Sequence, residues 1–211
     1  FKAIAAGDYT NYALAADGSI VAWGFDAYNA VTNTPTGTGF KQIAANVHGG
    51  IALRADGSIA TWGEDTYATI SNTPTGTGFI SIGAGRRTDF AIRANGSIAA
   101  WGWNFKGEVS NAPTGTGFKQ VTGSDSNGFA LNSAGEISVW GDSFGGVIGD
   151  RPLTSGFSQV VGSAFTGYAL SGSNDPNVVP EPSSSLICLL FSSAFWRLSG
   201  WKYSKRVSRM A

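Results

Sequence analysis

The stretch DGSIVAWG at residues 17–24 decides the fold, because it returns every 39 residues. It recurs as DGSIATWG at 56–63, as NGSIAAWG at 95–102 and as AGEISVWG at 134–141. A repeat of this length indicates an array of one supersecondary unit. Other landmarks keep the same period, namely Phe1, Phe40, Phe79, Phe118 and Phe157, and Pro35, Pro74, Pro113 and Pro152.

One copy of the repeat predicts three short antiparallel strands. In the first copy the runs at residues 1–6, 11–15 and 19–23 are apolar or alternating, without helical periodicity. Asp17-Gly18 predicts a type I′ hairpin, in which both central residues have positive φ. The Thr-Pro-Thr-Gly-Thr-Gly segment at 34–39 ends the unit, because proline and paired glycines stop a strand.

So small a sheet cannot bury both of its faces alone, and neighbouring units must therefore stack. Radial stacking gives a β-propeller, and a linear solenoid is the competing geometry. The apolar character of every strand favours the closed arrangement. We predict an all-β fold, a β-propeller of 39-residue repeats. Its blades are expected at residues 1–39, 40–78, 79–117 and 118–156, with a partial blade at 157–171.

Composition and charge exclude several classes of protein. The net charge is zero, and residues 1–171 contain nine basic and twelve acidic residues. This balance predicts no basic surface for nucleic acid. Cys188 is the only cysteine, which excludes a disulfide framework, a cysteine zinc site and a thiol pair. We expect neither a cofactor nor a metal.

The repeat resembles that of the regulator of chromosome condensation (RCC1) family. The resemblance rests on Ala-Ala-Gly at 5–7, Tyr-Ala-Leu at 12–14 and the stretch at 17–24, which recur at matching offsets over residues 1–171. The short repeats look most like the bacterial branch, which includes a β-lactamase inhibitor protein. The family's loop after Trp-Gly is kept in part at Asn104 and Gly107, and the first two copies depart from it.

This resemblance implies a seven-bladed β-propeller. Four full copies and a partial fifth are too few for seven blades. We therefore expect the chain to be a fragment, with two or three blades missing upstream. A small closed ring of five blades, the last one incomplete, is the alternative.

The composition changes after residue 171. Residues 172–178 have the composition of a linker, and residues 179–211 contain Pro180-Glu181-Pro182, an apolar segment and a basic end. This order resembles the PEP-CTERM sorting signal of Gram-negative bacteria. The resemblance implies export, processing by an exosortase and delivery to the cell surface or extracellular matrix. Residues 183–201 would form an apolar helix that associates transiently with the inner membrane; an amphipathic helix packed on the propeller is the alternative.

No position of the repeat predicts a catalytic residue. The tryptophans of the four stretches quoted above are expected in the core between blades, rather than as sugar platforms. His48 is the only histidine, and we expect a solvated histidine in the link between two strands. The neighbouring acids Glu64 and Asp65 could serve acid–base chemistry, but the other copies do not repeat them. A solvated acidic loop is therefore expected there.

The copies differ most in two sets of loops, namely the links between first and second strands and the residues after Trp-Gly. Variable loops on a constant scaffold are where binding usually resides, and aromatic side chains can anchor a partner. Relaxed constraint on exposed loops is the alternative. The candidate binding residues are Tyr9, Phe25, Asp26, Tyr28, His48, Asp65, Tyr67, Arg86, Arg87, Trp103 and Phe105.

These features favour an exported, non-catalytic binding module that recognises an extracellular protein or a polysaccharide through its rim loops. A lyase or hydrolase built on the propeller face is the second class, because fold alone does not decide function. A regulator of the guanine-nucleotide-exchange type, known among eukaryotic relatives, is the third. The export signal argues against a cytosolic GTPase partner. A purely structural matrix protein is a further alternative.

Overall fold

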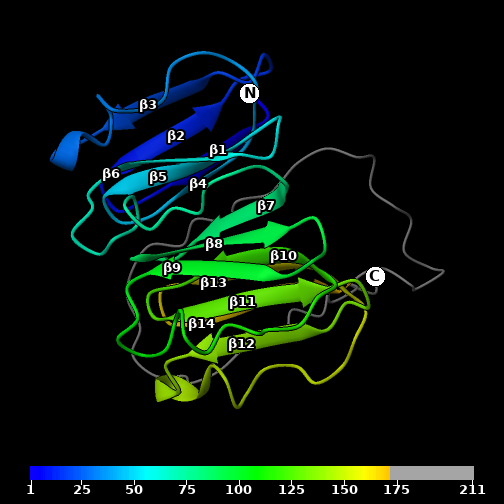
Figure 1. The fold of residues 1–211 in the computed structure, drawn as a ribbon. Coiled ribbons are helices and arrows are strands. Elements are labelled where there is room, and N and C mark those ends of the chain that lie inside the picture. Colours follow the sequence, from blue (N-terminus) through cyan, green and yellow to red (C-terminus); the bar gives the residue numbers. More distant parts are fainter. Residues whose placement is uncertain (172–211) are drawn as a thin grey trace, which may run out of the picture.

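The computed structural model describes residues 1–171 of the chain (Figure 1). The predicted linker, the Pro180-Glu181-Pro182 motif and the predicted apolar helix lie outside the described residues. Within residues 1–171 the helical elements are two short 3₁₀ turns, η1 (Ala27–Asn29) and η2 (Phe144–Gly146). Neither approaches the length and apolar character that a membrane-spanning helix needs.

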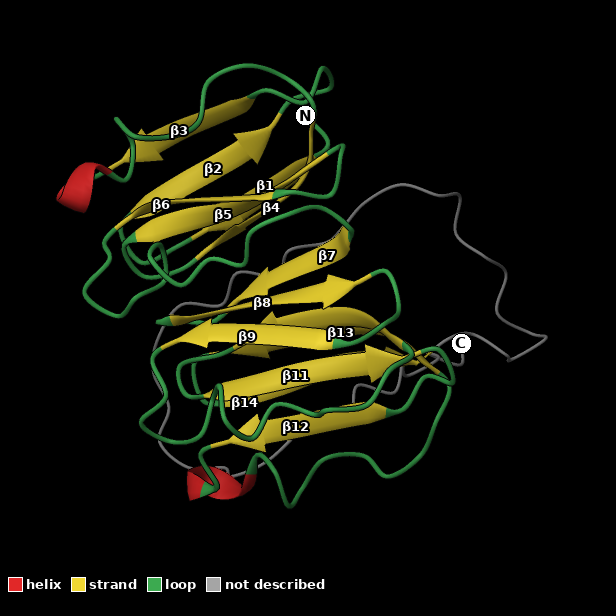
Figure 2. Cartoon of the chain, in the orientation of Figure 1, coloured by secondary structure: helices red, strands yellow, loops and turns green. Residues whose placement is uncertain are grey.

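The described residues form five antiparallel sheets that follow one another in sequence order (Figures 1 and 2). Four sheets have three strands each, and the fifth has two, β13 and β14. The prediction of an all-β fold built from repeated three-stranded units is therefore confirmed. The strands are β1 (Ala3–Ala6), β2 (Thr10–Leu14), β3 (Ile20–Gly24), β4 (Phe40–Ala45), β5 (Gly49–Arg54), β6 (Ile59–Gly63), β7 (Phe79–Ala84), β8 (Thr88–Arg93), β9 (Ile98–Gly102), β10 (Phe118–Gly123), β11 (Asn127–Asn132), β12 (Ile137–Gly141), β13 (Phe157–Ser163) and β14 (Thr166–Ser171).

The hairpin between β2 and β3 differs from the predicted type I′ turn. Gly18 has a φ of 84°, whereas Asp17 does not take a positive φ. The Gly18 N–H donates to the Ala15 carbonyl at 3.1 Å, and the Ala15 N–H donates to the Ser19 carbonyl at 2.8 Å. This is a three-residue loop in which only the glycine is left-handed. The fourth copy can therefore carry Ala134 where the first carries Asp17.

Successive blades stack through their first and second strands. The second strand of each blade packs on the first strand of the next, and the first strands of neighbouring blades also contact one another. The repeated tryptophans at 62, 101 and 140 are each 4% exposed, which confirms the expected core position for three of the four. Trp23 is 46% exposed, because no sheet within residues 1–171 packs against that face of the first blade.

A glutamine adds a second link between some blades. The register of β4 shifts between Phe40 and Gln42, and a shift of this kind can redirect a side chain. The Gln42 amide lies beside β7, where it donates to the Ile82 carbonyl and accepts from the Ile82 N–H, both at 3.0 Å. Gln120 makes the same pair of bonds to Val160 of β13. The side-chain amide thus satisfies backbone groups of the neighbouring blade.

Candidate binding rim

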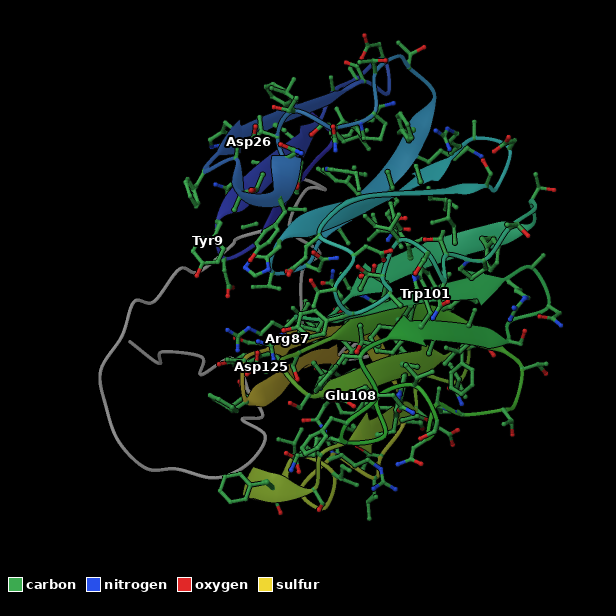
Figure 3. The ribbon with its side chains drawn as sticks, turned by 60° about the vertical axis from the view of Figure 1, so that its left-hand side comes forward. Tyr9, Asp26, Arg87, Trp101, Glu108 and Asp125 are labelled. Atoms are coloured by element: carbon green, nitrogen blue, oxygen red, sulfur yellow. The ribbon has the colours of Figure 1, made fainter. Side chains whose placement is uncertain are left out.

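Two loops of each three-stranded blade meet at one end of its sheet, and we call this surface the rim. They are the link between the first and second strands and the loop that follows the third strand. A backbone hydrogen bond joins them, and in the first blade the Phe25 N–H donates to the Tyr9 carbonyl at 2.9 Å. Figure 3 shows Tyr9, Arg87 and Asp125 along one edge of the molecule. The equivalent bonds run from Glu64 to His48 at 3.2 Å, from Trp103 to Arg87 at 2.8 Å and from Asp142 to Ser126 at 2.9 Å.

In the first three blades, the loop after the third strand is closed by a side-chain oxygen of its own. Asp26 Oδ1 accepts from the backbone N–H groups of Val31 at 2.7 Å and Thr32 at 3.0 Å, and Oδ2 accepts from the Thr32 hydroxyl. The Thr32 hydroxyl and these N–H donors lower the pKa of Asp26. Asp65 and Asn104 close their loops in the same way. The candidates Asp26 and Asp65 therefore hold their loops together, through both carboxylate oxygens of Asp26 and through Oδ1 of Asp65.

The same loops contain a left-handed residue at one fixed repeat position. Asn29 has a φ of 58° and Ala68 a φ of 57°, whereas the third and fourth blades place Gly107 and Gly146 there. Alanine in this conformation costs roughly 1–2 kcal/mol, because its Cβ crowds the following carbonyl. The preceding residue of the first two blades is a tyrosine. In the first two blades the left-handed residue therefore directly follows the tyrosine whose ring contacts the next blade.

Four side chains form an aromatic cluster between the first two blades, which we call the first cluster. It consists of Tyr9, Phe25, Tyr28 and His48. The His48 ring stacks on Tyr9 with centroids 5.3 Å apart, and the centroid of Tyr28 lies 4.6 Å from that of His48. Phe25 meets Tyr9 edge to face at 6.2 Å and is 68% exposed. Tyr9 and Tyr28 are exposed as well. A partner can therefore contact these rings directly.

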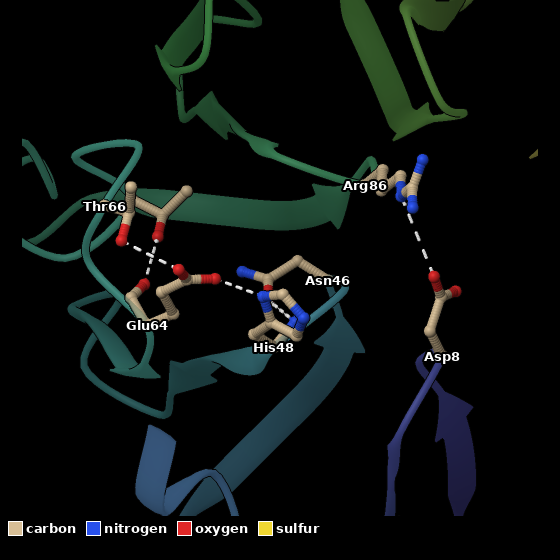
Figure 4. A network of polar contacts seen from close by, with 7 residues as sticks. Asp8, Asn46, His48, Glu64, Thr66 and Arg86 are labelled. Carbon is tan, nitrogen blue, oxygen red and sulfur yellow. Dashed lines mark hydrogen bonds and ion pairs between the residues drawn. The ribbon is translucent and has the colours of Figure 1, made fainter. Parts of the chain in front are cut away.

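A carboxylate holds the imidazole of the first cluster. Figure 4 shows His48 Nδ1 directed at Glu64 Oε2, while the Thr66 hydroxyl donates to Glu64 Oε1 at 2.7 Å. The His48 and Glu64 side chains are only 19% and 11% exposed. The expectation of a solvated histidine and a solvated acidic Glu64 was wrong, because the backbone bond within the blade places the two residues side by side.

A second cluster lies between the second and third blades and consists of Tyr67, Arg87, Trp103 and Phe105. The Arg87 guanidinium lies over the Tyr67 ring at 4.8 Å. Tyr67 meets Trp103 edge to face at 5.1 Å, and Trp103 stacks on Phe105 at 5.9 Å. Phe105 is 72% exposed and Trp103 is exposed beside it. All four residues of the second cluster are candidates that the comparison of the loops had identified.

The two clusters share one plan. In each, a tyrosine from one blade contacts the first-link residue of the next, as Tyr28 contacts His48 and Tyr67 contacts Arg87. At the third interface Lys106 stands at the tyrosine position, and its Nζ lies 3.5 Å from Asp142 Oδ2. The same backbone therefore carries an ion pair there, and the aromatic clusters end at the third blade.

Arg86 links blades rather than contributing to either cluster. Its Nε lies 3.7 Å from Asp8 Oδ2, and its Nη1 lies 3.3 Å from Asp125 Oδ1 (the Asp8 contact is drawn in Figure 4). Its backbone carbonyl accepts from the Val47 N–H at 2.9 Å, and its N–H donates to the Ser124 carbonyl at 3.0 Å. Because the side chains are partly exposed, each ion pair contributes no more than about 1 kcal/mol. Arg86 thus ties neighbouring first links together.

The buried tryptophans anchor the rim to the core. Trp62 Nε1 donates to the Ala30 carbonyl of the preceding blade at 3.1 Å, and Trp101 Nε1 donates to the Thr69 carbonyl at 2.9 Å. Trp140 makes the equivalent bond to the carbonyl of Glu108 at 2.7 Å. Each acceptor belongs to the loop after a third strand. The core residue of one blade therefore holds the rim loop of its neighbour.

Solved structures with a similar fold cover most of this chain. The ectodomain of the receptor kinase CR4 from Physcomitrella patens matches with a TM-score of 0.66 and 22% identity, over 83% of this chain and 48% of that one. Prp20p of Saccharomyces cerevisiae, which is yeast RCC1, matches with a TM-score of 0.63 and 16% identity, over 82% of this chain and 56% of that one. Human WBSCR16 matches with a TM-score of 0.63 and 16% identity, over 77% of this chain and 55% of that one.

At these identities the likeness concerns the fold alone. No family model and no curated protein matches the chain. The chain spans about half the length of the CR4, Prp20p and WBSCR16 structures. Its described part consists of repeated antiparallel sheets that resemble propeller blades, and its fold is similar to that of RCC1-like β-propellers.

Proposed function

We propose that this protein is a non-catalytic binding module that recognises an extracellular protein or a polysaccharide through the rim. One observation carries the proposal: exposed aromatic side chains gather on one edge, at loop positions that vary between blades. Phe25 of the first cluster is 68% exposed, and Phe105 of the second cluster is 72% exposed. Exposed aromatic anchors on a rigid scaffold are typical of binding surfaces.

The binding proposal is tested with the whole protein, presented as bait to extracellular proteins of the host and to a polysaccharide array. The double variant Tyr9→Ala with Phe25→Ala removes the exposed rings of the first cluster. We expect the wild type to retain a ligand that this variant loses. Absence of any ligand, together with turnover of some substrate by the wild type, would refute the proposal.

We further propose that the protein is exported and sorted to the cell surface by its tail. Support comes from the order of Pro180-Glu181-Pro182, an apolar segment and a basic end in the sequence. Fractionation of host cells with mass spectrometry of the C-terminal peptide tests this. A surface form that ends near Pro182 supports the proposal, and a soluble intracellular form that ends at Ala211 refutes it.

A closed seven-bladed ring, of which the described blades are a part, is also proposed. The exposed face of the first blade supports it, since Trp23 there is uncovered while the equivalent tryptophans donate to a preceding blade. A blade of the same kind would bury that ring and accept its N–H. Indole fluorescence of Trp23 in the intact natural protein tests this. Emission typical of a buried tryptophan supports ring closure, and solvent-exposed emission refutes it.

A lyase or hydrolase is the second candidate, and the contact between His48 and Glu64 favours it. A carboxylate on one imidazole nitrogen orients the ring for proton transfer at the other. Incubation with polysaccharides, followed by assay of new reducing ends, measures this activity. Turnover that is lost in His48→Gln, with ligand binding retained, would establish the enzyme in place of the binding module.

A further inference from the structure

We infer that the two aromatic clusters form a track for a neutral polysaccharide, with one subsite at each interface between blades. The inference rests on the proposed binding function and specifies its ligand. It begins with the shape of the exposed groups. A sugar ring has an apolar face of C–H groups and an edge of hydroxyls, so it stacks on an aromatic ring and needs polar partners beside it. Phe25 and Phe105 present such rings.

Polar groups border both aromatic surfaces. In the first cluster the Tyr9 and Tyr28 rings carry hydroxyls, and the imidazole of His48 lies between them. In the second cluster Trp103 carries an indole N–H. Arg87 lies beside this residue, because the backbone N–H of Trp103 donates to the Arg87 carbonyl. Each subsite thus combines a platform for stacking with donors or acceptors for hydroxyl groups.

The repetition of the two clusters matches a repeating ligand. Tyr28 and Tyr67 stand at the same repeat position, as do His48 and Arg87. Each tyrosine contacts the equivalent residue of the next blade, Tyr28 through a ring pair with His48 and Tyr67 through a cation–π contact with Arg87. A polymer that occupies one subsite holds its next units near the other at high effective concentration. Two weak subsites on neighbouring blades are therefore enough for useful avidity.

Charge pairing on the rim favours a neutral chain. His48 is paired with Glu64, Arg86 with two aspartates, and Lys106 with Asp142. Residues 1–171 also contain more acids than bases, nine basic against twelve acidic. An anionic polymer would need an unpaired basic surface, which these pairs do not leave. The guanidinium of Arg87 is the exception, and it already lies over the Tyr67 ring.

Polar side chains beside the second cluster argue against a protein as the main ligand. The centre of a protein interface is an apolar area that excludes water and charge. Here the exposed Asp65 and Thr66 directly precede Tyr67 on the loop after β6, so a charged and a hydroxyl side chain adjoin a ring of the second cluster. Exposed rings with polar neighbours suit sugar units along a chain better than one continuous apolar patch for a protein.

The test titrates the full chain with soluble neutral polysaccharides and reads tryptophan fluorescence. Trp103 is the reporter, and the signal change is expected to disappear in Trp103→Phe. Phe25→Ala and Phe105→Ala are each expected to weaken binding about tenfold, the change that about 1.4 kcal/mol produces. Phe144→Ala is the matched control, because Phe144 holds the Phe105 position in the fourth blade and is 84% exposed beside Asp142 instead of a tryptophan.

Four results would overturn the inference. Equal weakening by Phe105→Ala and Phe144→Ala would show that the clusters are not the site. Binding of anionic polysaccharides alone would refute the neutral chain. Capture of a protein through Phe25 and Phe105, without any polysaccharide, would refute the ligand class and leave the binding function standing. Failure to bind either kind of ligand would refute both proposals.

Discussion

Asparagine in place of Asp89 is expected to stabilise the protein at neutral and alkaline pH and to change little in acid. Asp89 lies in β8 and is fully buried, and neither of its carboxylate oxygens has a hydrogen-bond partner within residues 1–171. Burial raises the pKa of this carboxyl to about 7, and the neighbouring Asn46 amide offsets only a part of that rise. The first blade already holds asparagine at this repeat position, as Asn11.

The sign of the pH dependence follows from proton binding. In the unfolded chain the Asp89 carboxyl has its ordinary pKa of 3.8, while in the folded protein it is about 7. Between these values the folded state binds more protons than the unfolded state, so the free energy of unfolding falls as pH rises. The difference corresponds to about 4 kcal/mol at most, reached above the folded pKa. An amide does not titrate, so Asp89→Asn removes this fall.

Guanidinium unfolding of the two proteins at a series of pH values measures the effect. Their stabilities should agree near pH 4 and diverge up to about pH 7, with the variant the more stable. Asp17→Asn is the control, since the third repeat holds Asn95 there. Hydrogen bonds from Ser19 lower the pKa of Asp17, so its stabilising contribution is present above the ordinary pKa and is lost in acid. If Asp89→Asn leaves the pH dependence of the wild type unchanged, the desolvation argument fails.

Four further substitutions test the fold, one of them as a control. Ala68→Gly is expected to raise the free energy of unfolding by about 1 kcal/mol, because glycine takes the left-handed φ of 57° without strain. Trp101→Phe should lower it by about 2 kcal/mol through loss of a buried hydrogen bond. Trp23→Phe is the control, and where no blade packs on Trp23, as in residues 1–171, it should change the free energy of unfolding by less than about 0.5 kcal/mol. Gln42→Ala should cost about 2 kcal/mol, because it leaves both backbone groups of the buried Ile82 unpaired. Urea denaturation measures all four.

The repeat predicted the strands well because its signals are local. Apolar runs, the turn glycine and the terminating proline each act within a few residues, so the three strands of a blade follow from one copy. The hairpin type could not be read, because it depends on the pairing of Ala15 with Ser19 across the turn. The exposure of Trp23 also escaped prediction. That exposure depends on which sheet packs against this face of the first blade. The stretch at 17–24 itself has the same pattern as the three later copies, whose tryptophans are buried.

Comparison of the copies located the rim but did not assign its chemistry. Loop variation pointed to Tyr9 and Phe25, which the structure places in one cluster. It missed Glu64, because the contact with His48 depends on a hydrogen bond between two loops that are 16 residues apart. The sequence did contain a signal for this contact, since Tyr9 and Phe25 in the first blade are separated by the same 16 residues as His48 and Glu64 in the second. The closing role of Asp26 could likewise have been read from the recurrence of an Asp or Asn at its repeat position.

The link between core and rim explains how one scaffold can hold different chemistry at each blade. Every rim loop is held from within by an Asp or Asn side chain in the first three blades, and from the next blade by a tryptophan N–H. Neither hydrogen bond involves the aromatic side chains of the two clusters. Tyr28 and Lys106 can therefore occupy the same position, one against His48 and the other beside Asp142, on the same backbone plan. Because these hydrogen bonds hold the loops without the cluster side chains, we expect substitutions of those side chains to have little effect on stability and, under the proposed function, to change the affinity for the ligand.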